Sequence, residues 1–362
     1  MSTVIPVTIS NNHASGTYRT LGDDSQVQKF PTESSVKIEE HQPSVLKSSF
    51  KGLMDYAHNS SFGSGILKFT ATTLYVFNHM ALALGVDLGV DSLIEGELNR
   101  KLFQPGLVIK RPKEPLEMIK LLPSKPDESN LYGYYFENPN SDLAVIYLHG
   151  YNGSMFECHP ECKKIKEELN ANVLMVDYRG FGISEGSPTI EGAVRDTERM
   201  YDYLINEKKL KGKNILIYGV SLGGALALET YVTKLKPEGK EIGAIYLLYP
   251  FSSIRDITKW RYPEIPSSII PDKRLNSKHL ARKVDIPIHL AHGNADDCTP
   301  FRQTLQIYRS ARLLDQEQKE IYIIDGVGHQ DIMEVAASNP SVNGYFESLK
   351  RFTVKHFPGH KL

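Results

Sequence analysis

The chain has 362 residues, of which 41% are hydrophobic and 23% are charged. This length suits one large α/β domain with additional segments. The formal net charge is −1, so no overall electric field attracts the protein to nucleic acid or to an anionic membrane, and we expect no nucleic-acid partner. The three cysteines, Cys158, Cys162 and Cys298, are too few for a disulfide framework and indicate a reducing compartment.

Residues 1–45 are polar, rich in Ser and Thr, and show no hydrophobic periodicity. This composition predicts a disordered tail, because it cannot bury enough surface to offset the entropy of ordering. Residues 1–30 hold no basic segment followed by an apolar one, so we expect no Sec-type signal peptide. A cytoplasmic or peripheral-membrane location follows as the prediction, and non-classical secretion stays open.

Residues 46–110 predict a helical extension. Gly65–Asp91 is strongly apolar and carries one narrow polar stripe at helical spacing, and Asp91–Phe103 predicts a second, amphipathic helix. Three interpretations of the apolar segment compete: a helix buried on the catalytic domain or over its mouth, a membrane-surface or re-entrant helix, and a spanning helix. The first is favoured and spanning is the least favoured, because polar residues interrupt the apolar run. We therefore expect residues 65–103 to act as a lid or a peripheral membrane contact.

Residues 111–362 predict a catalytic α/β domain. Helices are expected between the strands, notably over Ile190–Asn206 and Ala225–Val232, and such alternation is typical of a mostly parallel sheet covered on both faces. Ligands of such sheets bind at the carboxyl ends of the strands. Only about 35 residues separate Tyr249 from Val284, which leaves no room for a large cap domain. The predicted strands are Leu116–Leu122, Leu131–Glu137, Leu143–Leu148, Val173–Asp177, Ile215–Tyr218, Gly243–Tyr249, Ile286–Ala291 and Ile321–Ile324.

The segment Asn214–Gly224, NILIYGVSLGG, joins a predicted strand to a predicted helix through a G-x-S-x-G turn. This context is typical of a nucleophile elbow, in which flanking glycines permit a strained turn that exposes the serine. Ser221 is therefore the candidate nucleophile. The first N–H groups of the following helix would face an oxyanion formed there.

Three more turns follow predicted strands. In His149–Ser154, HGYNGS, the backbone N–H of Tyr151 is the candidate oxyanion donor that would act together with the N–H of Leu222. In His292–Pro300, HGNADDCTP, Asp296 and Asp297 both qualify by position as the acid of a triad. His329, on a glycine-flanked turn after the last strand, is the candidate base, which completes the chain order Ser, Asp, His.

Two further features have structural interpretations. The loop Asp177–Gly186 is compact and glycine-rich, and we expect Arg179 to pair with Asp177 or with a nearby carboxylate. The pair Cys158 and Cys162 could suggest a metal knuckle, but it lacks a second pair of ligands, so the start of a surface helix is favoured. We predict no metal and no cofactor.

Together these motifs resemble those of the α/β-hydrolase superfamily and, more narrowly, of its Bem46-like, monoacylglycerol-lipase-like serine hydrolases. The resemblance runs from about residue 115 to the end of the chain. It implies that Asp296 rather than Asp297 is the acid. Two departures are mild: Thr299 stands where the family usually has Val, and Tyr151 stands where it usually has Asn, at a position where only the backbone donates.

The resemblance implies a serine hydrolase that cleaves carboxylic esters or thioesters, with lipid or acyl substrates favoured, through an acyl-enzyme. Its relatives include lysophospholipases, acylglycerol lipases, protein depalmitoylases and peptidases, and some carry an N-terminal membrane helix. A serine peptidase is therefore one alternative. The other is a non-catalytic binding module on a hydrolase scaffold, against which the intact set of Ser, Asp and His argues. Acyl length, head group and oligomeric state are not specified by these motifs.

Overall fold

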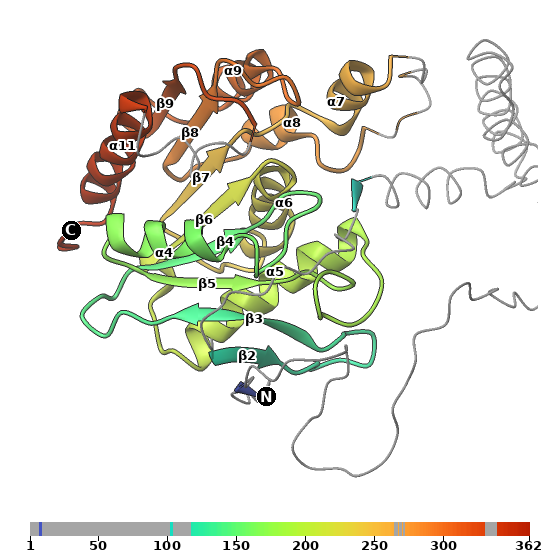
Figure 1. Ribbon diagram of the computed structural model, residues 1–362, viewed down its shortest axis with the longest axis vertical. Helices are drawn as coiled ribbons and strands as arrows, with labels where there is room; N and C mark the ends of the chain where they lie inside the picture. Colours follow the sequence, from blue (N-terminus) through green and yellow to red (C-terminus); the bar gives the residue numbers. More distant parts are fainter. Residues whose placement is uncertain are drawn as a thin grey trace, which may run out of the picture. The chain divides into compact units, whose positions relative to one another are not determined.

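From residue 117 onward, the helices and strands of the computed structural model follow the predicted alternation (Figure 1). The structure describes residues 7–8, 102–103, 117–263, 267, 270, 272–329 and 339–362. The predicted tail, apart from residues 7–8, lies outside the described residues. So do the apolar helix predicted over Gly65–Asp91 and nearly all of the helix predicted over Asp91–Phe103.

A sheet of nine strands, in the order β1-β2-β3-β5-β4-β6-β7-β8-β9, forms the centre of the fold (Figure 1). The three pairs at the β1 end are antiparallel, and the five pairs from β5 to β9 are parallel. Each of the eight predicted strands overlaps one of β2–β9 to within two residues at either end. The bounds are β1 Val7–Thr8, β2 Glu117–Leu121, β3 Leu131–Phe136, β4 Ala144–Leu148, β5 Asn172–Val176, β6 Ile215–Val220, β7 Ala244–Leu248, β8 Ile288–Gly293 and β9 Lys319–Ile324.

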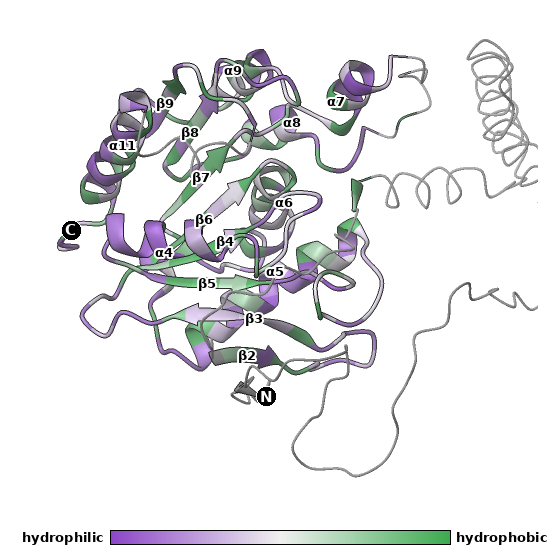
Figure 2. Cartoon of the chain, in the orientation of Figure 1, coloured by the Kyte–Doolittle hydropathy of each residue, from purple (hydrophilic) through white to green (hydrophobic). Residues whose placement is uncertain are grey.

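Strands β4 to β8 are buried along their whole length. They are short, nearly continuous apolar runs, because a parallel sheet is covered on both faces and has no solvent side to alternate with. In Figure 2, hydrophobic residues gather along β5, β7 and β8, whereas α4 and α11 carry many hydrophilic residues. The sequence pattern therefore specifies the centre of the sheet directly.

Helices cover both faces of the sheet. One hydrophobic cluster joins the sheet to α5, α6, α8 and α9, and a second joins its other face to α4 and α11. Since side chains alternate across each strand, successive residues such as Val145 and Ile146 enter different clusters. The helices are α4 His159–Glu168, α5 Ile190–Asn206, α6 Leu222–Thr230, α7 Ile254–Arg261, α8 Ser277–Ala281, α9 Phe301–Ser310 and α11 Pro340–His356, with a 3-10 turn at Gly212–Asn214 and a π-helical turn at Tyr231–Leu235.

Helix starts follow local chemistry in three instructive cases. Helix α5 has the predicted bounds, and the side chain of Thr189 caps it by accepting the N–H of Gly192 at 2.9 Å. Helix α6 begins three residues earlier than the predicted start at Ala225, so the two glycines after Ser221 are helical. Helix α4 begins directly after Cys158, as the favoured interpretation of this segment expects, and Cys162 on that helix is buried.

Two short segments of the N-terminal part are described. Val7–Thr8 forms strand β1, which lies within the tail predicted to be disordered and pairs with β2. Without this pairing β2 would be an edge strand with unpaired backbone groups. Phe103, from the predicted extension, is 2% exposed, and its ring packs edge-on against Phe181 with 6.1 Å between ring centres. In the part of the chain that the structure describes, no helix is both long and apolar enough to cross a membrane.

The connection between β7 and β8 is the place where a cap domain could be inserted. Its described residues contain two short helices, α7 and α8. This agrees with the expectation that the connection is too short for a large cap.

Candidate active site

Ser221 occupies the sharp turn between β6 and α6. Its backbone adopts φ +53° and ψ −112°, a conformation that is costly for a residue with a Cβ atom. The turn is held by two hydrogen bonds: the N–H of Ser221 donates to the carbonyl of Leu248 at 2.8 Å, and the N–H of Gly224 donates to the carbonyl of Ser221 at 3.0 Å. The serine is 7% exposed at the carboxyl edge of the sheet. This is the geometry expected of a nucleophile elbow.

The glycines that flank Ser221 are required by close backbone contacts. A Cβ atom on Gly219 would lie 2.4 Å from the carbonyl oxygen of Gly223, and one on Gly223 would lie 2.0 Å from the carbonyl oxygen of Leu148. Any larger residue would force the backbone apart, since atoms cannot approach so closely. The second contact presses the start of α6 against the end of β4, next to the His149–Ser154 turn.

The two candidate oxyanion donors lie on these adjoining backbones. Leu222 is the first residue of α6, so its N–H has no acceptor within the helix. Tyr151 follows β4 by three residues and is partly buried against the core. The guanidinium of Arg261, at the end of α7, lies over the Tyr151 ring at 5.5 Å from its centre. Helix α7 therefore approaches the site from the side of the oxyanion turn.

His329 and Asp296 form a direct hydrogen bond, with 2.7 Å between Nδ1 of the histidine and Oδ2 of the aspartate. Their side chains are 7% and 0% exposed. The other carboxylate oxygen of Asp296 accepts the backbone N–H groups of Cys298 and Thr299, both at 2.8 Å. Because a carboxylate only accepts, Nδ1 of His329 carries the hydrogen and Nε2 keeps its lone pair.

A second histidine, which the sequence analysis did not assign, supports the same aspartate. Nε2 of His292 lies 3.0 Å from Oδ2 of Asp296 and 2.7 Å from the carbonyl oxygen of Thr299, and its Nδ1 lies 2.6 Å from the hydroxyl of Thr304. Burial opposes ionisation of Asp296, but the hydrogen bonds from His292, His329 and the Thr299 N–H outweigh it and hold the pKa of this carboxyl well below its usual range. Asp296 is therefore a carboxylate at any ordinary pH.

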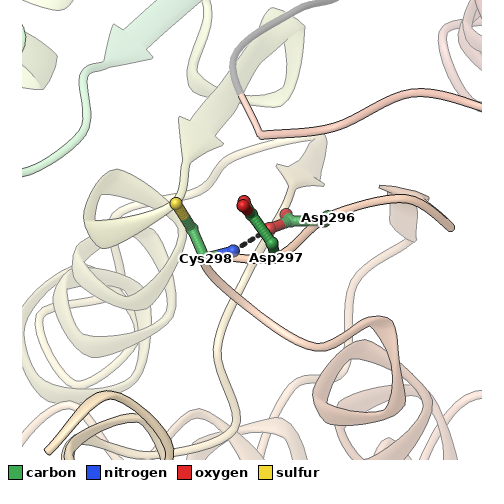
Figure 3. A group of neighbouring side chains, drawn as sticks. All are labelled: Asp296, Asp297 and Cys298. Carbon is green, nitrogen blue, oxygen red and sulfur yellow. Dashed lines mark hydrogen bonds between the residues drawn. The ribbon is translucent and has the colours of Figure 1, made fainter.

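Asp297, the other candidate acid, is not the carboxylate that His329 binds. Figure 3 shows it beside Asp296 and Cys298, with only the backbone N–H of Cys298 bonded to Asp296. Asp297 is exposed, and its carbonyl accepts the indole N–H of Trp260 at 3.4 Å. The three side chains offer ligand atoms within 4.8 Å of one another. We assign no metal to them, because the Asp296 carboxylate is already bonded to His329 and to two backbone N–H groups.

Tyr249 is another residue that the sequence analysis missed. It follows β7 with φ +53°, is fully buried, and its ring centre lies 5.1 Å from that of His329 and 5.6 Å from that of His292. A tyrosine in the left-handed region persists only where its surroundings require it. Here it forms a wall for the histidine ring. No motif in the sequence signals this role.

Arg179, for which two partners were open, pairs with Asp196 rather than Asp177. Three hydrogen bonds of 2.8–3.2 Å join the guanidinium to the Asp196 carboxylate, which also accepts the N–H of Arg179. This buried pair ties the loop after β5 to helix α5, so Arg179 has a structural role.

Known proteins share this architecture. Residues 144–265 match the family described as alpha/beta hydrolase fold. The chain is 30% identical to YfhR of Salmonella typhi over 223 residues, which make up 59% of this chain and 75% of YfhR. The chain belongs to the α/β-hydrolase family. The resemblance inferred from the motifs is thereby confirmed, and a hydrolase is the activity that membership of this family supports.

Two further similarities agree with this assignment. This α/β hydrolase is 25% identical to Bem46 of Schizosaccharomyces pombe over 223 residues, which cover 61% of this chain and 70% of Bem46. An esterase of Pyrococcus furiosus superposes with a TM-score of 0.55 at 19% identity, over 70% of this chain and 98% of the esterase. At that identity the likeness establishes the fold, and the chemistry has to be argued from the site.

Proposed function

We propose that this α/β hydrolase is a serine hydrolase that cleaves carboxylic esters or thioesters through an acyl-enzyme on Ser221. The observation that carries the proposal is the 2.7 Å bond from His329 to a buried aspartate, at the same edge of the sheet as a serine with φ +53°. The bond leaves Nε2 of His329 as the basic atom, and the turn raises Ser221 clear of its strand.

The proposed reaction has two steps. Ser221 Oγ attacks the acyl carbonyl carbon while Nε2 of His329 accepts the hydroxyl proton; the C–O or C–S bond of the substrate then breaks, and the proton passes to the departing alkoxide or thiolate, which leaves as an alcohol or a thiol. Water next attacks the acyl-enzyme, and His329 accepts its proton and returns that proton to Ser221. In both steps Asp296 stabilises the imidazolium, and the N–H groups of Tyr151 and Leu222 would stabilise the oxyanion.

Lipid or acyl substrates are favoured by the rim of the site. Trp260 is 55% exposed, although large aromatic side chains are usually buried, and its bond to the carbonyl of Asp297 keeps it beside the acid turn. An acyl chain that leaves the site past this indole would gain apolar contact. We further propose that residues 65–103 contribute a lid or a peripheral membrane contact, which would suit a protein acting on lipid from the cytoplasmic side of a membrane.

The test is active-site labelling of the full chain with a fluorophosphonate probe, followed by mass spectrometry of the tryptic peptides. We expect stoichiometric labelling at Ser221, and hydrolysis of p-nitrophenyl butyrate that ends when labelling is complete. Labelling at another residue would refute the assignment. A folded protein that neither reacts with the probe nor cleaves esters would instead be a binding module, and one that cleaves peptides far faster than esters would be a peptidase.

We expect Trp260→Ala to lower kcat/KM for p-nitrophenyl decanoate about tenfold and to leave the acetate ester within about twofold, since about 1.4 kcal/mol of lost apolar contact is a tenfold effect. Leu313→Ala is the matched control, because Leu313 is 60% exposed but precedes the amino end of β9, at the opposite edge of the sheet. An equal loss on both esters would contradict an acyl-chain contact at Trp260.

A further inference from the structure

Two buried polar side chains lie behind the oxyanion turn and take no part in the proposed triad. His149 follows β4 and Asp177 follows β5, and these strands are parallel neighbours, so both residues lie at the carboxyl edge of the sheet. Both are completely buried. Nε2 of His149 lies 3.8 Å from Oδ1 of Asp177.

Hydrogen bonding specifies which nitrogen of His149 carries the hydrogen. Nδ1 lies 2.8 Å from the carbonyl oxygen of Gly150, and a carbonyl can only accept, so Nδ1 is the donor and Nε2 has a lone pair. Oδ1 of Asp177 accepts the N–H of Met155 at 2.6 Å. Nε2 of His149 and Oδ2 of Asp177 make no hydrogen bond with any residue that the structure describes. A lone pair thus faces a carboxyl group, which is favourable only if the two share a proton.

The surroundings do not supply a positive charge to a carboxylate at this position. Among the described residues, no lysine or arginine lies within 4.0 Å of Asp177, and Arg179 is engaged by Asp196. The rings of Tyr178 and Phe181 lie 4.2 and 5.0 Å from the His149 ring, between centres. Burial raises the pKa of Asp177 to about 8 and lowers the pKa of His149 to about 4, so both groups are neutral near pH 7.

We propose that Asp177 is held as a carboxylic acid that donates its hydrogen to Nε2 of His149, and that this neutral pair positions the oxyanion turn. The carboxyl oxygen nearest to Nε2 is Oδ1, which accepts the Met155 N–H, so the carboxyl group must turn to bring the unbonded Oδ2, which carries the hydrogen, to Nε2. The inference rests on the proposed function, because it assigns Tyr151 as an oxyanion donor.

The link to the oxyanion is the peptide unit between Gly150 and Tyr151. Its carbonyl oxygen is the one that His149 binds, and its N–H is the candidate donor. In a trans peptide the C=O and N–H point in opposite directions within one plane. His149 holds the Gly150 carbonyl toward its own ring, so the Tyr151 N–H points in the opposite direction, away from that ring. Asp177 in turn fixes the orientation of the His149 ring. Both are positioning residues, since neither reaches the substrate.

The decisive comparison is between Asp177→Asn and Asp177→Leu. Asparagine keeps an oxygen for the Met155 N–H and offers an N–H to His149, as the carboxylic acid does, so kcat should stay within about threefold of wild type. Leucine removes the donor, and kcat should fall about 10- to 100-fold with KM nearly unchanged, somewhat less than the loss of an entire oxyanion donor. Rates are expressed per active site titrated with the fluorophosphonate, and affinity for a boronic acid inhibitor should fall in parallel with kcat.

A matched control separates positioning from stability. His289, on β8, is 1% exposed, has its pKa lowered to about 4 by burial, and bonds to Ser348 at 2.8 Å, far along the strand from the site. His149→Leu should lower kcat per titrated site, whereas His289→Leu should lower only the melting temperature.

The pH profile gives an independent test that needs only folded variants. A carboxyl with a raised folded pKa contributes stability that is complete below 3.8, its unfolded value, and is lost as pH rises through about 8. Ionised Asp177 has no hydrogen to donate to His149, so wild-type kcat should also decline above about pH 8, and Asp177→Asn should remove that decline. The other groups facing Asp177 are Glu157, Cys158 and Tyr178, and burial raises the pKa of Cys158 and Tyr178 out of this range.

The outcomes are distinct. If Asp177→Asn is as damaging as Asp177→Leu, the aspartate acts as an anion beside an imidazolium, and the proposal is wrong. If both variants keep full kcat per titrated site, or if the alkaline decline persists in Asp177→Asn, the pair has no positioning role. A wild-type protein without esterase activity would refute the proposed function itself, before any variant is compared.

Discussion

Ser221→Ala is expected to lower kcat by about six orders of magnitude and to abolish fluorophosphonate labelling. Loss of the nucleophile from a serine protease triad has an effect of about this size, because the remaining groups can only assist direct attack by water. Alanine keeps the Cβ atom that makes φ +53° costly, so the turn gains neither freedom nor strain. We therefore expect the melting temperature to stay near that of wild type. The measurement is ester hydrolysis and labelling on the same preparations.

Ser184→Ala is the control for this variant. Ser184 is also 7% exposed and lies on the loop after β5, where its hydroxyl donates to the carbonyl of Asp177 at 2.8 Å. Its replacement should reduce stability and leave labelling intact. If labelling persisted in Ser221→Ala and were lost in Ser184→Ala, the nucleophile would be Ser184 on the loop after β5, and the assignment of Ser221 would be wrong.

The sequence predicts those parts of the site whose requirements are local. Gly219 and Gly223 signal the elbow because the contacts that exclude a Cβ atom lie within the turn or on the adjoining strand end. The parallel strands are equally visible, since burial on both faces makes each a continuous apolar run. Motif order then points to His329 and to the acid turn, the family resemblance selects Asp296 over Asp297, and the 2.7 Å bond from His329 to Asp296 agrees with that choice.

Other features depend on neighbours that are distant in the chain. Tyr249 supports His329 from a different loop, 80 residues earlier in the chain. Its positive φ cannot be predicted from its residue type, because tyrosine rarely adopts that conformation. The choice of Asp196 as the partner of Arg179 likewise depends on where α5 crosses the loop. His149 and Asp177 belong to motifs that the sequence does reveal. That they face each other, however, follows from the pairing of β4 with β5 and not from either motif.

Asp296→Asn is expected to lower kcat by about 10⁴-fold, the loss seen when the aspartate of a serine protease triad is amidated. The amide N–H groups of asparagine cannot accept the Nδ1–H of His329, so the ring would favour the other tautomer and present a hydrogen to Ser221. The backbone N–H groups of Cys298 and Thr299 require an acceptor as well, so the amide oxygen faces them and its nitrogen faces His329. KM for a short ester should change little, because binding does not depend on the tautomer.

Asp297→Asn provides the matched control, since the same chemical change is made one residue away on an exposed side chain that the structure does not bond to His329. Its kcat should stay within about threefold of wild type, as is usual for an exposed position. The reverse ranking would reassign the acid of the triad. Asp177→Asn completes the series: three aspartates at one edge of the sheet receive an identical change. Only Asp296, the one held as an anion between a histidine and two N–H groups, should be intolerant of it.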